Sequence, residues 1–143
     1  MADFSIVTDI AASPTAVWGV IADVERWPEW TPSVRSIKRY DAGPLVLGSR
    51  AHIEQPKLRP ADWVVTRIEH GRGFDWMTRA PGLAVTGGHW IEAIPQGSRV
   101  TVSIRLEGLL SPMVSWLARK LNASYLDQEA SGLKAYCEAG MRT

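Results

Sequence analysis

Residues 83–106, LAVTGGHWIEAIPQGSRVTVSIRL, decide the fold of this chain because they predict two long strands joined by a tight turn. In the second half of the stretch, apolar residues alternate strictly with polar ones, which is the period of a strand with one buried face. The apolar set is Val100, Val102, Ile104 and Leu106. Pro95-Gln96-Gly97 has residue types that turns favour. Because so short a connection makes two strands antiparallel neighbours, the stretch predicts a long hairpin.

Outward from this hairpin, similar patterns predict the rest of an antiparallel meander. Further strands are expected at residues 4–10, 34–40, 49–55, 63–70 and 74–79. After the first strand, Ser13 and Pro14 are the residue types that begin a helix. Pro28 and Pro32 confine the next residues to a short helical turn or loop. The expected order is therefore one strand, two short helices and six strands.

A long helix is expected at residues 112–138, but its apolar residues do not form one stripe. The first half carries Met113, Trp116, Leu117 and Leu121 on one face, and the second half carries Leu126, Ala130, Leu133 and Cys137 on a face displaced by nearly half a turn. The helix must either bend near residues 122–124 or pack its halves against different partners. Since an antiparallel sheet of this length needs a cover on one face, we expect an α+β fold in which this helix covers a curved sheet.

Composition sets limits on the function. The length of 143 residues fits one domain, residues 1–143. Sixteen lysines and arginines face fifteen acidic residues, so the chain shows no electrostatic footprint for nucleic acid. No apolar run approaches a membrane-spanning length, and the first residues do not resemble a signal peptide. Cys137 is the only cysteine, which excludes an intrachain disulfide and suits a cytoplasmic location.

The order of elements and a series of turn and packing residues resemble those of the START-like superfamily. This superfamily is also called SRPBCC, birch-pollen-allergen or helix-grip, and the resemblance is greatest to its bacterial polyketide cyclase/dehydrase-like branch. The matching residues span almost the whole chain: Ser13-Pro14, Val17-Trp18, Asp23, Trp27-Pro28-Glu29-Trp30, Gly43-Pro44, Gly48, Trp63-Val64-Val65, Phe74-Asp75-Trp76, Pro81-Gly82, His89, Gly97, Arg99-Val100-Thr101, Gly132-Leu133 and Glu138. Together they are specific for the fold and poorly specific for the activity.

The resemblance implies a helix-grip fold, in which a curved seven-stranded antiparallel sheet wraps around the long C-terminal helix, with two short helices after the first strand. It also implies a largely apolar internal cavity between sheet and helix. Members of the superfamily resemble one another in shape but bind lipids, polyketides, plant hormones or quinones. A small hydrophobic molecule is therefore the expected partner.

His89 is the polar residue most strongly indicated for such a cavity. It shares strand parity with Val85, Ile91 and Ala93, so it points inward among apolar residues, and Gly87 on the same face leaves room beside it. An inward histidine can hydrogen-bond a ligand or transfer a proton. The alternative is a core histidine whose nitrogens are satisfied by a neighbouring hydroxyl or carbonyl.

Aromatic and apolar residues supply the rest of the candidate cavity wall: Trp27, Trp30, Phe74, Trp76, Met113, Trp116, Leu117 and Leu121. The alternative is plain core packing for Phe74 and Trp76, and structural capping for Trp27 and Trp30. For the residues from Met113 to Leu121, the alternative is a face for homodimer contact. Trp63 and Trp90 are ambiguous, because strict parity favours the outer face of the sheet for both.

No catalytic motif is present. Nucleophile-elbow, P-loop and dinucleotide-binding patterns are missing, so no cofactor is expected. The histidines do not have metal-ligand spacing, so no metal is expected either; His52 belongs on the wet face and His70 beside an exposed turn.

Three hypotheses remain open: a non-catalytic binding protein for a lipid, polyketide or quinone-like molecule, a polyketide cyclase/dehydrase-type enzyme, and a protein-interaction module that uses the C-terminal helix.

Overall fold

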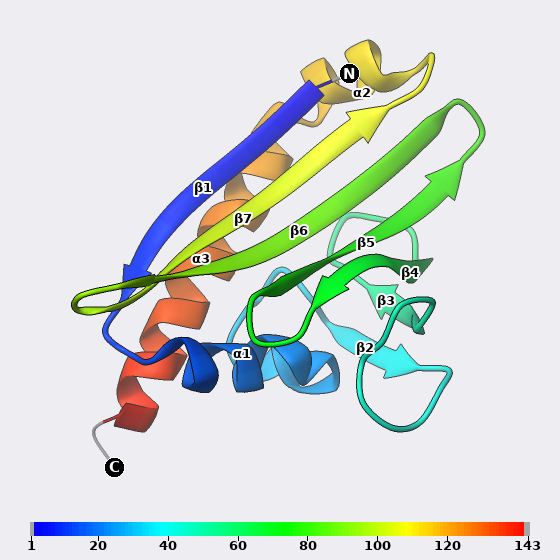
Figure 1. Ribbon diagram of the computed structural model, residues 1–143. Coiled ribbons are helices and arrows are strands. Elements are labelled where there is room, and N and C mark those ends of the chain that lie inside the picture. Colours follow the sequence, from blue (N-terminus) through cyan, green and yellow to red (C-terminus); the bar gives the residue numbers. More distant parts are fainter. Residues whose placement is uncertain (1, 142–143) are drawn as a thin grey trace.

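A computed structural model of the protein describes residues 2–141, in which seven strands form one antiparallel sheet (Figure 1). The order across the sheet is β1-β7-β6-β5-β4-β3-β2, so neighbours in sequence are neighbours in space except for β1, which closes against β7. The strands are β1 (Ala2–Ile10), β2 (Ser36–Arg39), β3 (Arg50–Glu54), β4 (Ala61–Glu69), β5 (Gly73–Ala80), β6 (Leu83–Ile94) and β7 (Gly97–Glu107). The expected seven-stranded antiparallel sheet is confirmed.

The β6–β7 hairpin lies between β1 and β5 in this sheet, as the long hairpin that residues 83–106 predict. Its register runs from Ile94 opposite Gly97 at the turn to Ala84 opposite Glu107 at the far end. Gly97 has a φ of 145°, and a side chain there would collide with the backbone of Ile10 and Ala12. A glycine is therefore required where the hairpin turn packs against the end of β1.

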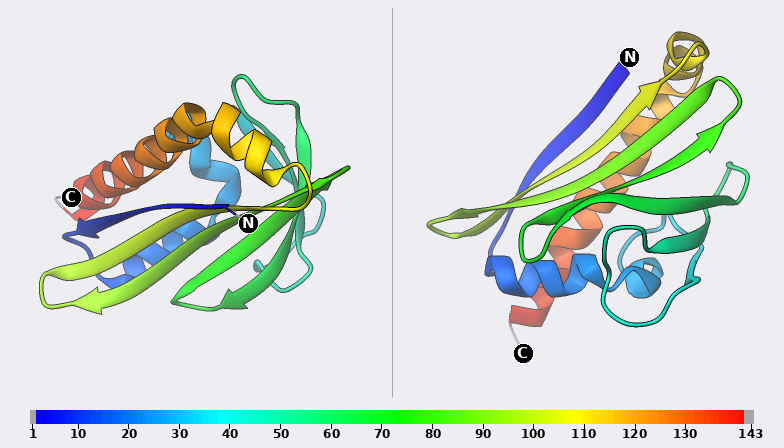
Figure 2. Two further views of the ribbon diagram at one scale, coloured as in Figure 1. Left: turned by 90° about the horizontal axis from the view of Figure 1, so that it is seen from above. Right: turned by 45° about the vertical axis from the view of Figure 1, so that its right-hand side comes forward.

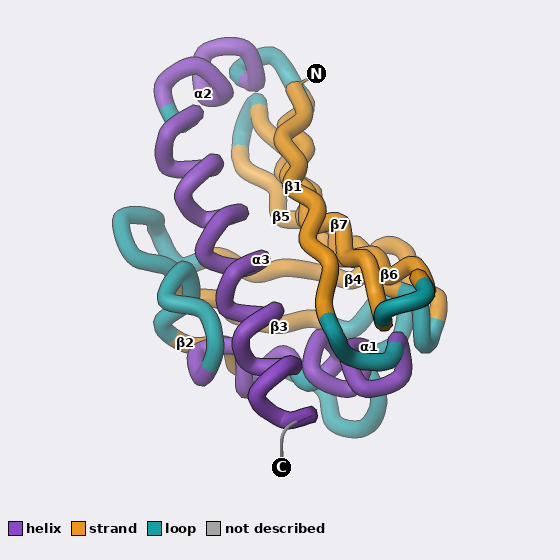
Figure 3. Tube along the Cα trace, turned by 90° about the vertical axis from the view of Figure 1, so that its left-hand side faces the viewer, coloured by secondary structure: helices purple, strands orange, loops and turns teal. Residues whose placement is uncertain are grey.

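Two short helices and two C-terminal helices complete the fold. Helix α1 (Pro14–Ala22) begins at Ser13, whose hydroxyl accepts a hydrogen bond from the Ala16 amide, and the 3₁₀ helix η1 (Val24–Glu29) follows it. Helices α2 (Ser111–Leu117) and α3 (Arg119–Met141) lie on the concave side of the sheet (Figure 2). Figure 3 shows α2 at one end of the molecule and α1 at the other. The expected α+β helix-grip architecture is thus confirmed.

The expectation of one continuous helix over residues 112–138 is wrong. The helix is interrupted at Ala118, where φ is −99° and ψ is 11°, and α3 begins at the next residue. The interruption precedes the bend expected near residues 122–124, and it leaves three residues of the first stripe on α2 and the fourth, Leu121, on α3. The second stripe is buried against the sheet, whereas Met113, Trp116 and Leu117 of the first stripe are exposed.

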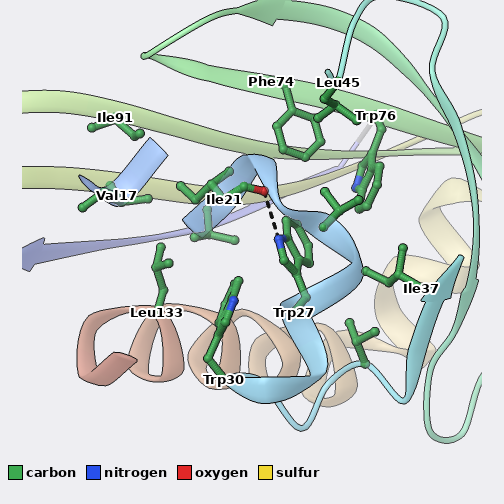
Figure 4. Close-up of a cluster of buried hydrophobic side chains, with 14 of the residues drawn as sticks. Val17, Ile21, Trp27, Trp30, Ile37, Leu45, Phe74, Trp76, Ile91 and Leu133 are labelled. Carbon is green, nitrogen blue, oxygen red and sulfur yellow. Dashed lines mark hydrogen bonds between the residues drawn. The ribbon is translucent and has the colours of Figure 1, made fainter. Parts of the chain in front are cut away.

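The hydrophobic core lies at the α1 end, between the sheet, η1 and the second half of α3 (Figure 4). Trp27 stands at its centre with 2% exposure, and its indole Nε1 donates a hydrogen bond to the Ile21 carbonyl at 3.0 Å. Phe74 and Trp76 approach it from β5, with ring centroids 6.2 and 5.3 Å away. The core therefore fills one end of the space between sheet and helix and leaves the other end for a cavity.

Candidate functional site

A cavity of about 250 Å³ occupies the space between the sheet and the start of α3. Side chains from β3, β4, β5, β6 and β7 form one wall, and side chains from α2 and α3 form the other. The wall is mostly apolar, which suits recognition of a small organic molecule. The apolar residues that line it are Trp27, Val34, Ile53, Leu58, Ala61, Trp63, Trp76, Leu83, Val85, Ile104, Leu106, Val114, Ala118 and Leu121.

Aromatic rings form the inner end of the cavity. Trp63 and Trp76 lie side by side with centroids 5.9 Å apart, and Trp76 contacts Trp27 at 5.3 Å. Gly87 on β6 stands opposite Trp76 on β5, and a Cβ there would lie 3.3 Å from the indole Nε1 of Trp76. The absence of a side chain at Gly87 therefore leaves room for the Trp76 ring within the wall.

Trp63 faces inward because of a β-bulge that the sequence pattern does not reveal. The β4–β5 register shifts between Val65 and Arg67, which leaves Thr66 as an extra residue. Before the bulge, Trp63 and Val65 share the inner face, whereas after it Ile68 does. Since one extra residue inverts strand parity, counting back from Ile68 places Trp63 on the wrong face.

The polar centre of the cavity is a pair of side chains from opposite walls. The His89 Nε2 on β6 lies 3.2 Å from the Glu129 Oε1 on α3, within hydrogen-bond distance. The side chains are 4% and 12% exposed respectively. The pairing satisfies a carboxylate that would otherwise be costly to bury. Both side chains line the cavity, so both lie beside the space that a ligand would fill.

Aromatic packing holds the His89 ring in place. The Phe74 ring stacks on it with centroids 5.3 Å apart and an angle of 26°, and Trp27 meets it edge-on at 4.7 Å. The Nδ1 of His89 is buried without a hydrogen-bond partner among the described residues. The imidazole is therefore fixed in orientation and joined to the protein's polar groups through Glu129.

One side of the cavity is formed by the β3–β4 loop together with the end of α2. Leu58 and Arg59 line it from the loop, and Val114 and Ala118 line it from the helical side. The Tyr125 hydroxyl donates a hydrogen bond to the Pro56 carbonyl, which ties the loop to α3. Burial raises the pKa of the Tyr125 phenol, so this donor keeps its proton at neutral pH.

The structure brings four of the nine candidate residues to the cavity: Trp27, Trp76, His89 and Leu121. Trp30 and Phe74 instead belong to the hydrophobic core at its inner end, with 7% and 0% exposure.

Three further candidates do not line the cavity: Met113, Trp116 and Leu117. The expectation that they form part of its wall is therefore corrected. They are 53%, 63% and 71% exposed, because the interruption at Ala118 turns their face of α2 toward solvent.

Glu129 and Trp63 are the site residues that the sequence analysis missed. Glu129 could have been found, since it stands three residues after Leu126 and four before Leu133, on the same helix face. A carboxylate at such a position within an apolar stripe indicates a buried acid. Trp63 carried no such signal because the bulge at Thr66 leaves no mark in the residue pattern.

Two further features of the described residues bear on function. No group of three or more histidine, cysteine, aspartate or glutamate side chains is arranged to hold a metal ion in residues 2–141. Within the same range, no helix combines the length and the apolar character needed to cross a membrane.

Solved structures with the same fold include proteins from several sources. TTHA0849 from Thermus thermophilus superposes with a TM-score of 0.76, at 14% identity over 97% of this chain and 99% of that chain. The Zhui aromatase/cyclase from Streptomyces sp. R1128 gives 0.74, at 13% identity over 99% and 96%. One part of the di-domain ARO/CYC StfQ, from the steffimycin biosynthetic pathway, gives 0.78, at 12% identity over 99% and 52%. At these identities the likeness shows a shared fold alone.

Comparison of sequences assigns the chain to a family, which the shared fold alone does not. No curated protein is similar enough to count as a match. A profile of the family described as polyketide cyclase/dehydrase and lipid transport, however, matches residues 1–138, almost the whole chain. The seven-stranded sheet, the long C-terminal helix and the cavity between them agree with that match. The chain therefore belongs to the polyketide cyclase/dehydrase and lipid transport family.

Proposed function

We propose that this protein binds a small, mostly apolar molecule that carries a hydroxyl group, and that the Glu129 carboxylate accepts the hydrogen bond of that hydroxyl. The observation that carries the proposal is one acidic side chain, paired with His89, in an otherwise largely apolar cavity. A buried carboxylate selects for a donor, because its pairing with His89 uses one oxygen and an apolar ligand leaves its remaining lone pairs unmatched.

The size of the cavity limits the ligand class. An apolar cavity of roughly 150 Å³ is enough for benzene, so the present volume of about 250 Å³ suits a bicyclic molecule or a short acyl chain. A ligand that hides roughly 300 Å² of apolar surface gains about 7 kcal/mol from burial. Part of this is lost to immobilisation, which leaves affinities typical of small-ligand binding proteins.

Binding of naphthol and naphthalene tests the proposal. Both fit a cavity of this size, and they differ by one hydroxyl. We expect the wild type to prefer naphthol by roughly tenfold or more, as a hydrogen bond to a charged acceptor contributes about 1.5–3 kcal/mol. Titration calorimetry or quenching of tryptophan fluorescence gives both affinities.

Matched variants locate the effect. Glu129→Gln keeps the size of the side chain and removes its charge, so the preference for naphthol should shrink severalfold. Asp127→Asn makes the same charge change on an exposed position of α3 and should leave the preference intact. Equal affinities for both ligands in the wild type would contradict the role of Glu129, and no measurable affinity for either would contradict the binding function.

A second candidate function, dehydration of a β-hydroxyketone, is favoured by the His89–Glu129 pair itself. In that reaction Glu129 would remove a proton from the carbon beside the carbonyl. The proton would return to the departing hydroxyl, which leaves as water while the carbon–carbon double bond forms. His89 would orient the carboxylate, and the enclosed cavity would hold the substrate in a reactive conformation.

An aryl β-hydroxyketone separates the two functions, because its loss of water gives a conjugated enone with strong ultraviolet absorption. If the protein is a dehydratase, His89→Ala abolishes turnover. If it only binds, the wild type shows no turnover and His89→Ala merely weakens affinity. Unchanged turnover in His89→Ala would contradict the catalytic role of the histidine.

A further inference from the structure

Large apolar side chains gather on the outside of the molecule at α2. We call Leu109, Leu110, Met113, Trp116 and Leu117 the α2 patch; they are exposed by 93%, 42%, 53%, 63% and 71%. Three come from α2 and two from the turn before it. Exposed apolar residues scattered singly are ordinary on a protein surface, whereas a contiguous set marks an interaction site.

The α2 helix carries its large apolar side chains on its outer face. Its inner face consists of Ser111, which is buried, and Val114, which lines the cavity together with Ala118 just after the helix. Its outer face has Met113, Trp116 and Leu117, where a helix at a water interface would have polar residues. Nothing in the fold of residues 2–141 requires these three side chains to be large and apolar. Their character therefore points to contact with something outside the chain.

The base of the α2 patch is held rigidly. The Leu110 amide donates to the Gly82 carbonyl at 2.9 Å, which joins the β7–α2 turn to the β5–β6 turn. Gly108 has a φ of 109°, and a Cβ there would lie 2.5 Å from the Gly82 oxygen. Because these glycines allow the two turns to meet, the patch is preformed and loses little entropy on docking.

Four cations lie near the α2 patch in the fold or the sequence, and one exposed acidic residue, Glu107, precedes it. The Arg119 guanidinium lies 3.8 Å from the centroid of the Trp116 ring, and Lys120 follows it on α3. Arg59 lines the cavity together with Val114, and Arg79 stands near the end of β5 beside the turn that holds Leu110. The ion pairs formed within residues 2–141 use other cations, and Arg119 donates a hydrogen bond to the Trp116 carbonyl at 2.7 Å, so no acidic side chain of the described residues neutralises these four charges in an ion pair.

We propose that the α2 patch docks on the surface of a membrane that contains anionic lipid. Met113, Trp116 and Leu117 enter the boundary between headgroups and acyl chains, and Arg119 and Lys120 pair with lipid phosphates. Tryptophan suits this boundary because its ring is apolar and its N–H is polar. An apolar surface flanked by cations is the usual requirement for binding in the plane of a membrane.

A second copy of the chain fits the α2 patch less well. A two-fold contact through it would bring Arg119 and Lys120 of one copy toward the same residues of the other, and like charges at an interface oppose association. A lipid surface, in contrast, supplies phosphates to the cations and hydrocarbon to the apolar residues. The charges therefore favour a membrane over self-association.

The α2 patch lies next to the cavity, so docking could bring the cavity close to the membrane. This role of the docking rests on the proposed ligand binding. Val114 and Ala118 line the cavity, while their neighbours Met113 and Leu117 belong to the patch. Figure 1 shows α2 at the same end of the molecule as the β5–β6 turn. An apolar ligand could thus pass between the lipid and the cavity along α2 without crossing open water.

Co-sedimentation with vesicles tests the docking. Wild-type protein should bind vesicles of phosphatidylcholine with phosphatidylglycerol more tightly than vesicles of phosphatidylcholine alone, and added salt should reduce the difference. The double variant Leu109→Ser with Leu117→Ser should bind more weakly by roughly tenfold or more, since each leucine loses its apolar contact. Leu47→Ser is the matched control, because Leu47 is 67% exposed in the β2–β3 loop at the other end of the molecule.

Three results would overturn the proposal. The first is no binding to either kind of vesicle, and the second is an equal loss in Leu47→Ser and in the double variant. The third is a dimer in sedimentation analysis that the double variant dissociates, which would assign the patch to self-association. Naphthol affinity, measured on the same proteins, separates this claim from the ligand-binding one: the double variant should keep it even if vesicle binding is lost.

Discussion

Trp27 is the residue on which both the core and the inner end of the cavity depend. It touches Trp30, Phe74, Trp76 and His89 with its ring and donates its N–H to a backbone carbonyl. We expect Trp27→Ala to lower the free energy of unfolding by about 3–5 kcal/mol, the usual cost of deleting a buried aromatic side chain. Trp116→Ala removes the same ring from an exposed site and should change stability by no more than about 0.5 kcal/mol. Urea denaturation measures both, and similar losses would contradict the assignment of Trp27 to the core.

Cys137 allows a chemical test of how tightly α3 is packed. Burial raises the pKa of its thiol to about 11, and the neighbouring Glu138 adds to the effect. Since the thiolate is the reactive form, almost none is present at neutral pH in the folded protein. Alkylation by iodoacetamide should therefore be far slower in the native protein than in urea. It should accelerate only as the pH approaches the raised value, and equal native and unfolded rates at neutral pH would contradict the burial.

The two site residues of greatest interest show what a sequence can reveal about a cavity. His89 could be placed inside because β6 has no bulge, so strict parity holds from Val85 to Ile91. Its partner Glu129 comes from 40 residues further along the chain, and only the docking of α3 on the sheet brings the two together. Parity thus identifies residues on a wall, whereas the pairing across the cavity requires the tertiary structure.

At the scale of elements, α3 docks against η1 through a glycine. A Cβ at Gly132 would overlap the carbonyl oxygen of Trp30, so no larger residue fits between the helix and this turn. We expect Gly132→Ala to destabilise the protein by at least about 2 kcal/mol, even though alanine favours a helix by roughly 1 kcal/mol over glycine. Thermal unfolding by circular dichroism would measure the change.

Gly19 in α1 is the matched control for this substitution. It also lies within a helix, but a Cβ there would have nothing within 4 Å. Gly19→Ala should therefore stabilise the protein slightly, by roughly 0.5–1 kcal/mol, through helix propensity. A destabilising Gly19→Ala or a neutral Gly132→Ala would show that α3 does not approach η1 as closely as described.

The C-terminal helices show why element boundaries are harder to predict than element types. The apolar residues of 112–138 indicated helix throughout, and the half-turn between their two stripes showed that a straight helix could not bury both. The position of the interruption at Ala118 follows from tertiary contacts, since Ser111 and Val114 face inward from α2 while α3 follows the sheet. Helical periodicity alone has no feature at Ala118 that marks it.

At the scale of the whole molecule, turn chemistry and alternation were enough to predict the strand order of a meander. The short connections between successive strands left few alternatives. The pairing of β1 with β7, the bulge at Thr66 and the size of the cavity could not be predicted in this way, because each depends on contacts between residues far apart in sequence. A cavity in particular is set by small differences in packing, which do not alter the pattern of polar and apolar residues.

Filling the cavity should separate binding from folding. Val85 lines the cavity from β6 and is partly exposed, so Val85→Trp can place a large ring in the space without crowding the buried core. We expect naphthol affinity to fall at least tenfold while the free energy of unfolding changes by less than about 1.5 kcal/mol. Calorimetric titration and urea denaturation of the same preparation give both values. Undiminished affinity would place the binding site elsewhere.

The central claim is that the space between sheet and helix holds a small molecule, and native mass spectrometry of the folded protein tests it most directly. Wild type and Val85→Trp are compared after purification and again with excess naphthol. The account predicts a one-to-one adduct on the wild type that disappears on denaturation and is missing from Val85→Trp. A wild type that keeps its bare mass in naphthol, or an equal adduct on both proteins, would contradict the account.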